Sequence, residues 1–245
     1  MRARAFLLLL LSACSSPSGL NSSLFQELAP LLHRPRLDSI PKVILPAYSA
    51  RLPEELTLAN GIRIFLMADP LVPGVALEIR LRMGSWHDPK SASGLAKLTM
   101  QTWRSGGTEA LPDAPLDREL SFLGASLEVE VQAMTTVLRL HCLEEDFPRL
   151  LGILEEMLFK PRFVAERMEL ERGIMLGRVA RRDNDPGSVA SRESRRAFYG
   201  RQDLRVRRIE SPELQGFSLA QAEEFFASHV GSRRALVQVL GNIPM

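Results

Sequence analysis

Alternating apolar and charged residues along Val75–Arg82 predict a β-strand with one buried face, because successive side chains of a strand point to opposite sides. Two further segments, Glu55–Leu58 and Ile62–Leu66, flank the dipeptide Asn60-Gly61. We expect a hairpin there, since Asn-Gly readily takes the positive φ values that a type I′ turn needs. More strands are expected over residues 126–131, 135–140 and 234–240.

Apolar residues recur every three or four positions between Leu150 and Leu158, which predicts an amphipathic helix that ends before Pro161. Ser218 is a favourable N-cap for another helix. Strand pairs that alternate with helix pairs predict an α+β fold, a two-layer sandwich with helices on one face of a largely antiparallel sheet. The other helices are expected over residues 117–123 with a stop at Gly124, 163–182, 189–198 and 218–228.

The N-terminal segment 1–14 has the layout of a secretory signal: arginines, an apolar run too short to span a bilayer, and small residues before Cys14. Its last four residues resemble a bacterial lipobox, which predicts a lipid anchor on Cys14. The alternative is an ordinary signal peptide whose cysteine is unmodified. Residues 15–50 are rich in Ser, Pro and Gly and predict a tether and linker. The folded domain is expected over 51–245.

Composition excludes few classes of protein. The net charge of +2 over 245 residues gives no support for nucleic-acid binding, because acids and arginines are interleaved along the chain. With Cys14 lipidated, Cys142 has no partner for an intramolecular disulfide, and the strand pattern places it on a buried face. The four histidines are too far apart in sequence to indicate a metal site: His33, His87, His141 and His229.

The segment Gly94–Thr108 reads GLAKLTMQTWRSGGT. It resembles the active-site helix of the pitrilysin/insulinase family of zinc metallopeptidases, in which Gly-Leu-Ala leads into His-x-x-Glu-His and the segment closes on Gly-Thr. In that motif two histidines share a helix face and bind zinc, while the glutamate polarises a water. Lys97, Met100 and Gln101 stand at these three positions here.

The resemblance also covers the third zinc ligand of the family, a glutamate in a later helix before an Asp-x-Pro turn. This chain has Arg178 at that position, upstream of Asp185-Pro186. Zinc needs deprotonated N, O or S donors, and a charged Lys or Arg offers no lone pair. The resemblance therefore implies a degenerate family member without zinc.

Lys97 and Arg178 would repel each other if the family fold is retained. Glu171 lies two helical turns before Arg178 and matches the family's auxiliary glutamate. We expect Glu171 to bridge to Lys97 or Arg178, as a clasp between two helices in place of the zinc. The alternative is that both cations extend to solvent.

The resemblance, which runs from about residue 55 to 241, implies a catalytically inactive, lipid-anchored protein of the bacterial cell envelope. Ser15 favours the outer membrane, facing the periplasm. The family's paired subunits imply a hetero-oligomer with an active peptidase subunit, in which this chain contacts the peptide. In the family another helix and strand follow the last strand, so the domain is expected to lack them. Two alternatives remain: a zinc-dependent metalloendopeptidase with an unrecognised site, and an unpaired peptide-binding scaffold lipoprotein.

Overall fold

The computed structural model describes residues 51–231 and 234–243. Arg51–Met245 forms one compact unit. The predicted domain boundaries stay predictions. The signal segment 1–14, the lipid site at Cys14 and the linker 15–50 lie outside the described residues. Among the described helices, none combines the length and apolar character that a membrane crossing requires.

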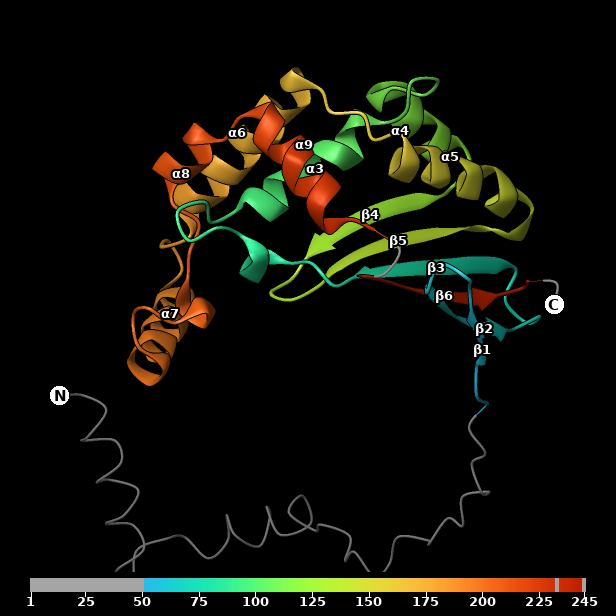
Figure 1. Ribbon diagram of the computed structural model, residues 1–245, viewed down its shortest axis with the longest axis horizontal. Helices are drawn as coiled ribbons and strands as arrows, with labels where there is room; N and C mark the ends of the chain where they lie inside the picture. The colour runs from blue at the N-terminus through green and yellow to red at the C-terminus, as the bar shows by residue number, and fades with distance from the viewer. Residues whose placement is uncertain (1–50, 232–233, 244–245) are drawn as a thin grey trace, which may run out of the picture. The chain divides into compact units, whose positions relative to one another are not determined.

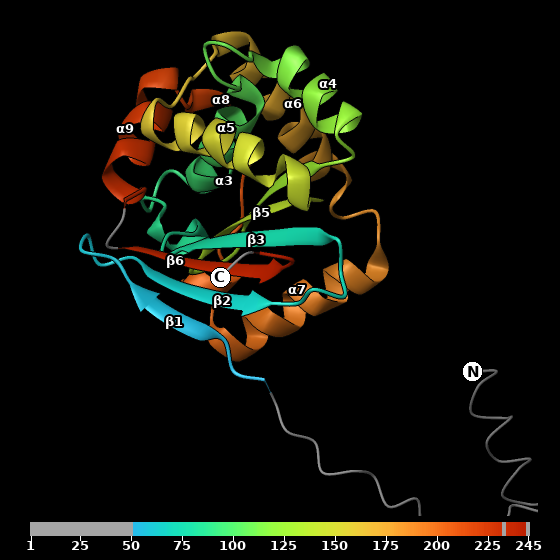
Figure 2. The same ribbon diagram turned by 90° about the vertical axis from the view of Figure 1, so that its right-hand side faces the viewer.

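The described strands form a six-stranded sheet in the order β1-β2-β6-β3-β5-β4. All neighbouring pairs are antiparallel except β2 and β6, which run parallel. The last strand of the chain thus lies inside the sheet, between β2 and β3 (Figure 2). The strands are β1 Glu54–Thr57, β2 Arg63–Ala68, β3 Gly74–Leu81, β4 Ser126–Val131, β5 Thr136–Leu143 and β6 Ala235–Gly241.

A layer of helices covers one face of the sheet, while α7 projects away from that layer (Figure 1). The predicted two-layer α+β sandwich is therefore confirmed. The helices are α3 Leu95–Gly106, α4 Asp113–Phe122, α5 Phe147–Phe159, α6 Ala165–Arg181, α7 Pro186–Tyr199, α8 Ser211–Gly216 and α9 Leu219–His229. Short 3₁₀ turns lie at Ser85–His87, Glu144–Asp146 and Leu204–Val206.

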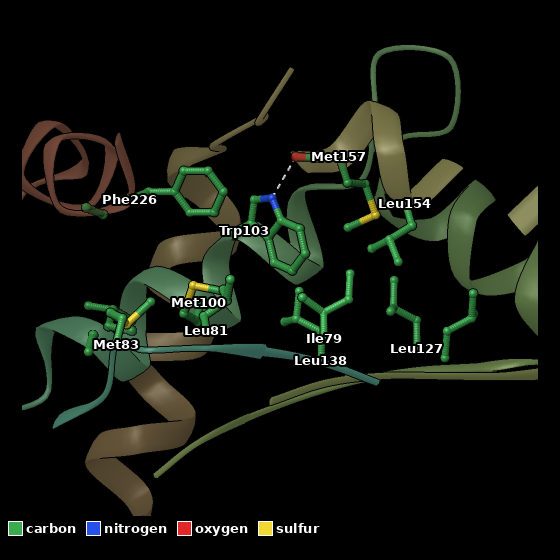
Figure 3. Packing of buried hydrophobic residues seen from close by; sticks show 14 of the residues in the cluster. Ile79, Leu81, Met83, Met100, Trp103, Leu127, Leu138, Leu154, Met157 and Phe226 are labelled. Carbon is green, nitrogen blue, oxygen red and sulfur yellow. Dashed lines mark hydrogen bonds between the residues drawn. The ribbon is translucent and has the colours of Figure 1, made fainter. Parts of the chain in front are cut away.

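The core lies between the sheet and helix α3. The apolar positions of β3, from Val75 to Leu81, are buried as their alternation predicts, and Cys142 is a buried free thiol opposite Val75. Trp103 of α3 is fully buried and donates a 2.8 Å hydrogen bond from Nε1 to the Met157 carbonyl of α5 (Figure 3). Its ring stacks on Phe226 of α9 at 5.8 Å, so one side chain joins three helices.

Three local predictions from the sequence need correction. The turn between β1 and β2 is not type I′. Such a turn needs positive φ values at both Asn60 and Gly61. Gly61 has a φ of 86°, but no non-glycine residue of the described chain has a positive φ. The Asn60 side chain instead accepts a hydrogen bond from the Ile62 amide at 3.1 Å and stabilises a longer loop. Helix α4 begins at Asp113, before the predicted start at 117. Helix α8 was not predicted, because it is only six residues long and contains Pro212 in its first turn.

The buried Arg172 of α6 explains how the α8 segment is held. Its guanidinium donates to the carbonyls of Leu214 and Phe217, and it pairs with Glu169 on its own helix. Buried backbone carbonyls need such donors, and a charged donor strengthens the bond. Sequence periodicity gives no signal for this contact, because it joins residues more than forty positions apart in the chain.

Candidate functional site

The candidate site is built on the first half of α3, whose start is fixed by a buried carboxylate. Asp88 accepts hydrogen bonds from the backbone amides of Gly94 and Ala96, both at 2.7 Å. These amides belong to the unpaired donors at a helix N-terminus, which favour a negative charge. Gly94 has a φ of 101°, and a Cβ there would lie 3.0 Å from the Ile209 side chain. Only glycine therefore fits between Asp88 and the segment before α8.

Burial raises the pKa of Asp88 from 3.8 to about 6, although the two amides and Arg207 oppose the shift. Because the folded pKa is the higher one, the unfolded chain releases this proton first as the pH rises from about 4 to about 6. The free energy of unfolding should then fall by about 3 kcal/mol from this group. Urea unfolding of the protein and of Asp88→Asn across this range would measure the effect. A stability difference between the two proteins that does not change with pH would contradict it.

Lys97 and Arg178, two of the degenerate ligand positions, are brought together as the resemblance implies. Both line a hollow of about 250 Å³ between α3 and α6, together with Met175 and Ile209. Burial lowers the pKa of Lys97, and the charge of Arg178 lowers it further. Two cations thus face one hollow: Lys97 is half-buried and Arg178 is exposed.

Met100 and Gln101, the other two degenerate positions, have structural roles. Met100 is fully buried and belongs to the same apolar cluster as Leu81 and Met83 (Figure 3). Gln101 donates a 3.1 Å hydrogen bond from Nε2 to the carbonyl of Val129 on the edge strand β4. One turn later, Arg104 donates to the Leu127 carbonyl of the same strand at 2.7 Å. The α3 side chains therefore occupy two backbone acceptors that an edge strand otherwise leaves open.

Glu171 makes no ion pair with Lys97 or Arg178 within the part of the chain that the structure describes. Burial raises the pKa of Glu171, and the nearby charges of Arg178, Arg167 and Arg104 oppose that rise. The carboxylate is thus close enough to interact electrostatically with Arg178 without a direct bond. A closed clasp in place of the zinc stays a prediction.

The resemblance implies that Lys97, Met100, Gln101 and Arg178 stand at the family's ligand positions. A charged ammonium or guanidinium offers zinc no lone pair, and a thioether or an amide is not among the side chains that usually bind zinc in proteins. Residues 51–231 and 234–243 contain no group of three or more His, Cys, Asp or Glu side chains placed to hold a metal ion. His87 and His229 lie edge to face with ring centroids 5.9 Å apart. The two histidines are far apart in the sequence, which therefore did not predict this contact. In the described chain no third metal-ligating side chain joins them.

A larger hollow, of about 720 Å³, lies away from α3. It is lined by β-strand residues such as Phe65, Met67 and Leu240, and by Glu78 and Arg139. These two form an ion pair at 3.1 Å across β3 and β5. The lining is mainly apolar, but besides this pair it includes His141 and Gln238. The described residues show no group of three metal-ligating side chains there, and the resemblance to an active-site helix lies on α3, so α3 is kept as the candidate site.

Residues 63–210, more than half of the chain, match the family described as Insulinase (Peptidase family M16). The chain belongs to this family. An uncharacterized zinc protease of Mycobacterium tuberculosis is 24% identical over 199 residues, which are 80% of this chain and 44% of that protein. The uncharacterized zinc protease YmxG of Bacillus subtilis is 21% identical over 188 residues, 76% of this chain and 46% of that protein. The chain thus spans less than half the length of these M16 relatives.

Solved structures of M16 proteins share the fold. An inactive domain of peptidase M16 from Pseudomonas fluorescens has a TM-score of 0.72 and 20% identity, and the match covers 78% of this chain and 47% of that one. The periplasmic protease PqqL from Escherichia coli has a TM-score of 0.70 and 18% identity, with coverage of 82% and 23%.

Proposed function

We propose that this M16 chain is a non-catalytic, peptidase-like lipoprotein that acts as the partner of an active zinc metallopeptidase subunit of the same family. The observation that carries the proposal is the shared hollow of Lys97 and Arg178, two cations at positions where the family binds a cation. A metal ion there would meet two positive charges and no donor. Met100 and Gln101 add only a buried thioether and an amide that already bonds to β4.

A pairing role is supported by a structural neighbour as well as by chemistry. One neighbour is an inactive domain of an M16 peptidase. A unit of this size without zinc ligands can help to enclose and orient a peptide that another subunit cleaves. We further propose a cell-envelope location with a lipid on Cys14. The lipobox-like segment supports this location, as does the structural similarity to the periplasmic protease PqqL of Escherichia coli.

The test combines this protein with a homologue from the same genome that carries an intact His-x-x-Glu-His motif. We expect the two to elute together in size-exclusion chromatography. This chain alone should cleave no quenched fluorescent peptide and contain no stoichiometric zinc. Its addition should raise the rate of the homologue by about 10- to 100-fold, because an enclosed and oriented peptide reacts faster.

Heat-unfolded chain at the same concentration is the control for that experiment. It should leave the rate of the homologue unchanged. Peptide cleavage by this chain alone, abolished by a chelator and restored by zinc, would refute the proposal and favour an active metalloendopeptidase. Failure to elute with any zinc-bearing homologue would favour the unpaired scaffold.

A further inference from the structure

Three adjoining hollows beside α3 form one groove, which we name the basic groove. The first, of about 250 Å³, contains Lys97 and Arg178; the second, of about 240 Å³, extends toward Trp86; the third, of about 330 Å³, lies against α7. Arg208 lines all three, and Lys97 lines the first two. The groove therefore runs from the degenerate ligand positions to the projecting helix.

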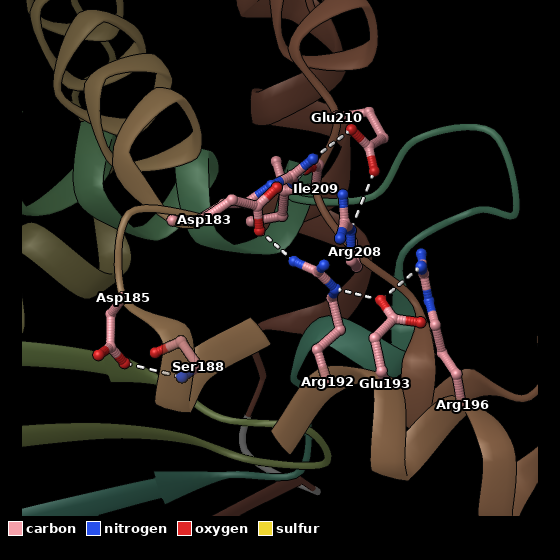
Figure 4. A network of polar contacts seen from close by, with 10 residues as sticks. Asp183, Asp185, Ser188, Arg192, Glu193, Arg196, Arg208, Ile209 and Glu210 are labelled. Atoms are coloured by element: carbon pink, nitrogen blue, oxygen red, sulfur yellow. Dashed lines mark hydrogen bonds and ion pairs between the residues drawn. The ribbon is translucent and has the colours of Figure 1, made fainter. Parts of the chain in front are cut away.

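The lining of the basic groove is strongly unbalanced in charge. It includes eight Lys or Arg side chains but only two carboxylates, Asp88 and Asp183. Neither carboxylate can neutralise all eight cations of the lining, because each is already engaged elsewhere. Asp88 is held by the amides at the start of α3, and Asp183 is paired with Arg192 of α7 (Figure 4).

Acids outside the lining neutralise part of the excess: Glu193 pairs with Arg192 and Asp203 pairs with Arg205, both at 2.7 Å. Glu210 is shared between two cations, at 2.7 Å from Arg182 and 3.2 Å from Arg208 (Figure 4). Lys97, Arg178 and Arg195 form no ion pair with a carboxylate within 51–231 and 234–243, and Glu171 interacts with Arg178 only without a direct bond. The pKa of Lys97 is lowered first by burial and further by the charge of Arg178, so the two cations in this hollow repel each other.

Apolar side chains alternate with these cations along the groove. Met175, Val179 and Ile209 line the hollow of Lys97, while Trp86 and Val131 line its neighbour. A bare polyanion would gain nothing from such contacts. A peptide brings carboxylates and aliphatic carbon together, so it matches both features of the lining.

We propose that the basic groove binds an extended acidic peptide segment, with one carboxylate seated between Lys97 and Arg178 in place of the metal of catalytic family members. The inference rests on the non-catalytic role proposed above, because a zinc site would exclude it. The carboxylate would relieve the repulsion between the two cations and accept charge-assisted hydrogen bonds from both. Neighbouring acidic side chains would meet the arginines toward α7.

Fluorescence anisotropy of the full chain with a short dye-labelled Glu/Ala peptide tests the proposal. The Gln/Ala isostere of that peptide should bind at least about tenfold more weakly. Lys97→Met and Arg178→Gln should each weaken binding of the Glu/Ala peptide about 10- to 100-fold, the range for losing a bond between charged groups. The exposed residues Lys160 and Arg118 provide the matched controls Lys160→Met and Arg118→Gln, which should bind as the unmodified chain does.

The inference would be overturned if the Glu/Ala and Gln/Ala peptides bound the chain with equal affinity. It would also be overturned if the groove variants bound the Glu/Ala peptide as tightly as their controls do. Inorganic phosphate that displaces the Glu/Ala peptide at the same concentration of charge would overturn it as well, and would assign the groove to small anions. Raised salt should weaken binding in either case, so salt dependence alone does not count as support.

A second measurement reports on Lys97 directly. The sequence has lysines only at 42, 90, 97 and 160, so isotope-labelled dimethyl-lysine signals can be resolved by NMR and assigned with Lys97→Met. The pKa of Lys97 should rise when the Glu/Ala peptide binds and stay unchanged with the Gln/Ala peptide. Zinc content separates the two proposals: a zinc-free chain that binds no acidic peptide refutes the groove alone, while a stoichiometric zinc refutes the non-catalytic role.

Discussion

The triple variant Lys97→His, Gln101→His, Arg178→Glu is expected to bind one zinc ion per chain, which the unmodified protein should not do. Positions 97 and 101 lie one turn apart on α3, and position 178 lines the same hollow as position 97. Two imidazoles and a carboxylate supply the three protein ligands of a catalytic-type zinc site, and the change also removes both repelling cations. At zinc about 100-fold above its dissociation constant, the free energy of unfolding should rise by about 2.7 kcal/mol.

Elemental analysis and thermal unfolding with and without zinc would measure these effects. The matched control is the double variant Lys97→His, Gln101→His, which keeps the guanidinium of Arg178 beside the site. It should bind zinc much more weakly. A triple variant that is folded but takes up no more zinc than the unmodified chain would show that the three positions do not converge as in catalytic members of the family.

Trp103→Ala is expected to lower the free energy of unfolding by about 3–5 kcal/mol, the usual cost of removing a large buried aromatic side chain. Trp103 is fully buried, stacks on Phe226 and donates to the Met157 carbonyl, so its loss leaves a cavity and an unpaired acceptor. Because α3 carries both Lys97 and Gln101, this packing also fixes the candidate site. Urea unfolding followed by circular dichroism would measure the change.

Trp103→Phe separates the two contributions. It keeps an aromatic ring against Phe226 but cannot donate to Met157, and we expect a smaller loss of about 1–3 kcal/mol. Phe122→Ala on the 86% exposed side chain of α4 is the surface control and should change stability by less than about 0.5 kcal/mol. A Trp103→Ala protein as stable as this control would contradict the packing described here.

The sequence by itself determined the elements whose pattern is local. Alternation along β3 located its buried face, and apolar spacing located α5. The Ser218 cap located α9, where the structure adds reciprocal bonds between Ser218 and Gln221. The family resemblance also predicts the four ligand positions, three of them by their spacing on one helix and Arg178 by its place before the Asp185-Pro186 turn.

Only the tertiary structure decided how those positions are used. The insertion of β6 between β2 and β3 and the bond from Gln101 to β4 join distant segments, so no local pattern encodes them. The sequence predicted an ion pair of Glu171 with Lys97 or Arg178, but the distance from Glu171 on α6 to Lys97 on α3 depends on how the two helices pack. The basic groove has the same origin: its arginines come from α6, α7 and the segment before α8, and only folding concentrates their charge beside Lys97.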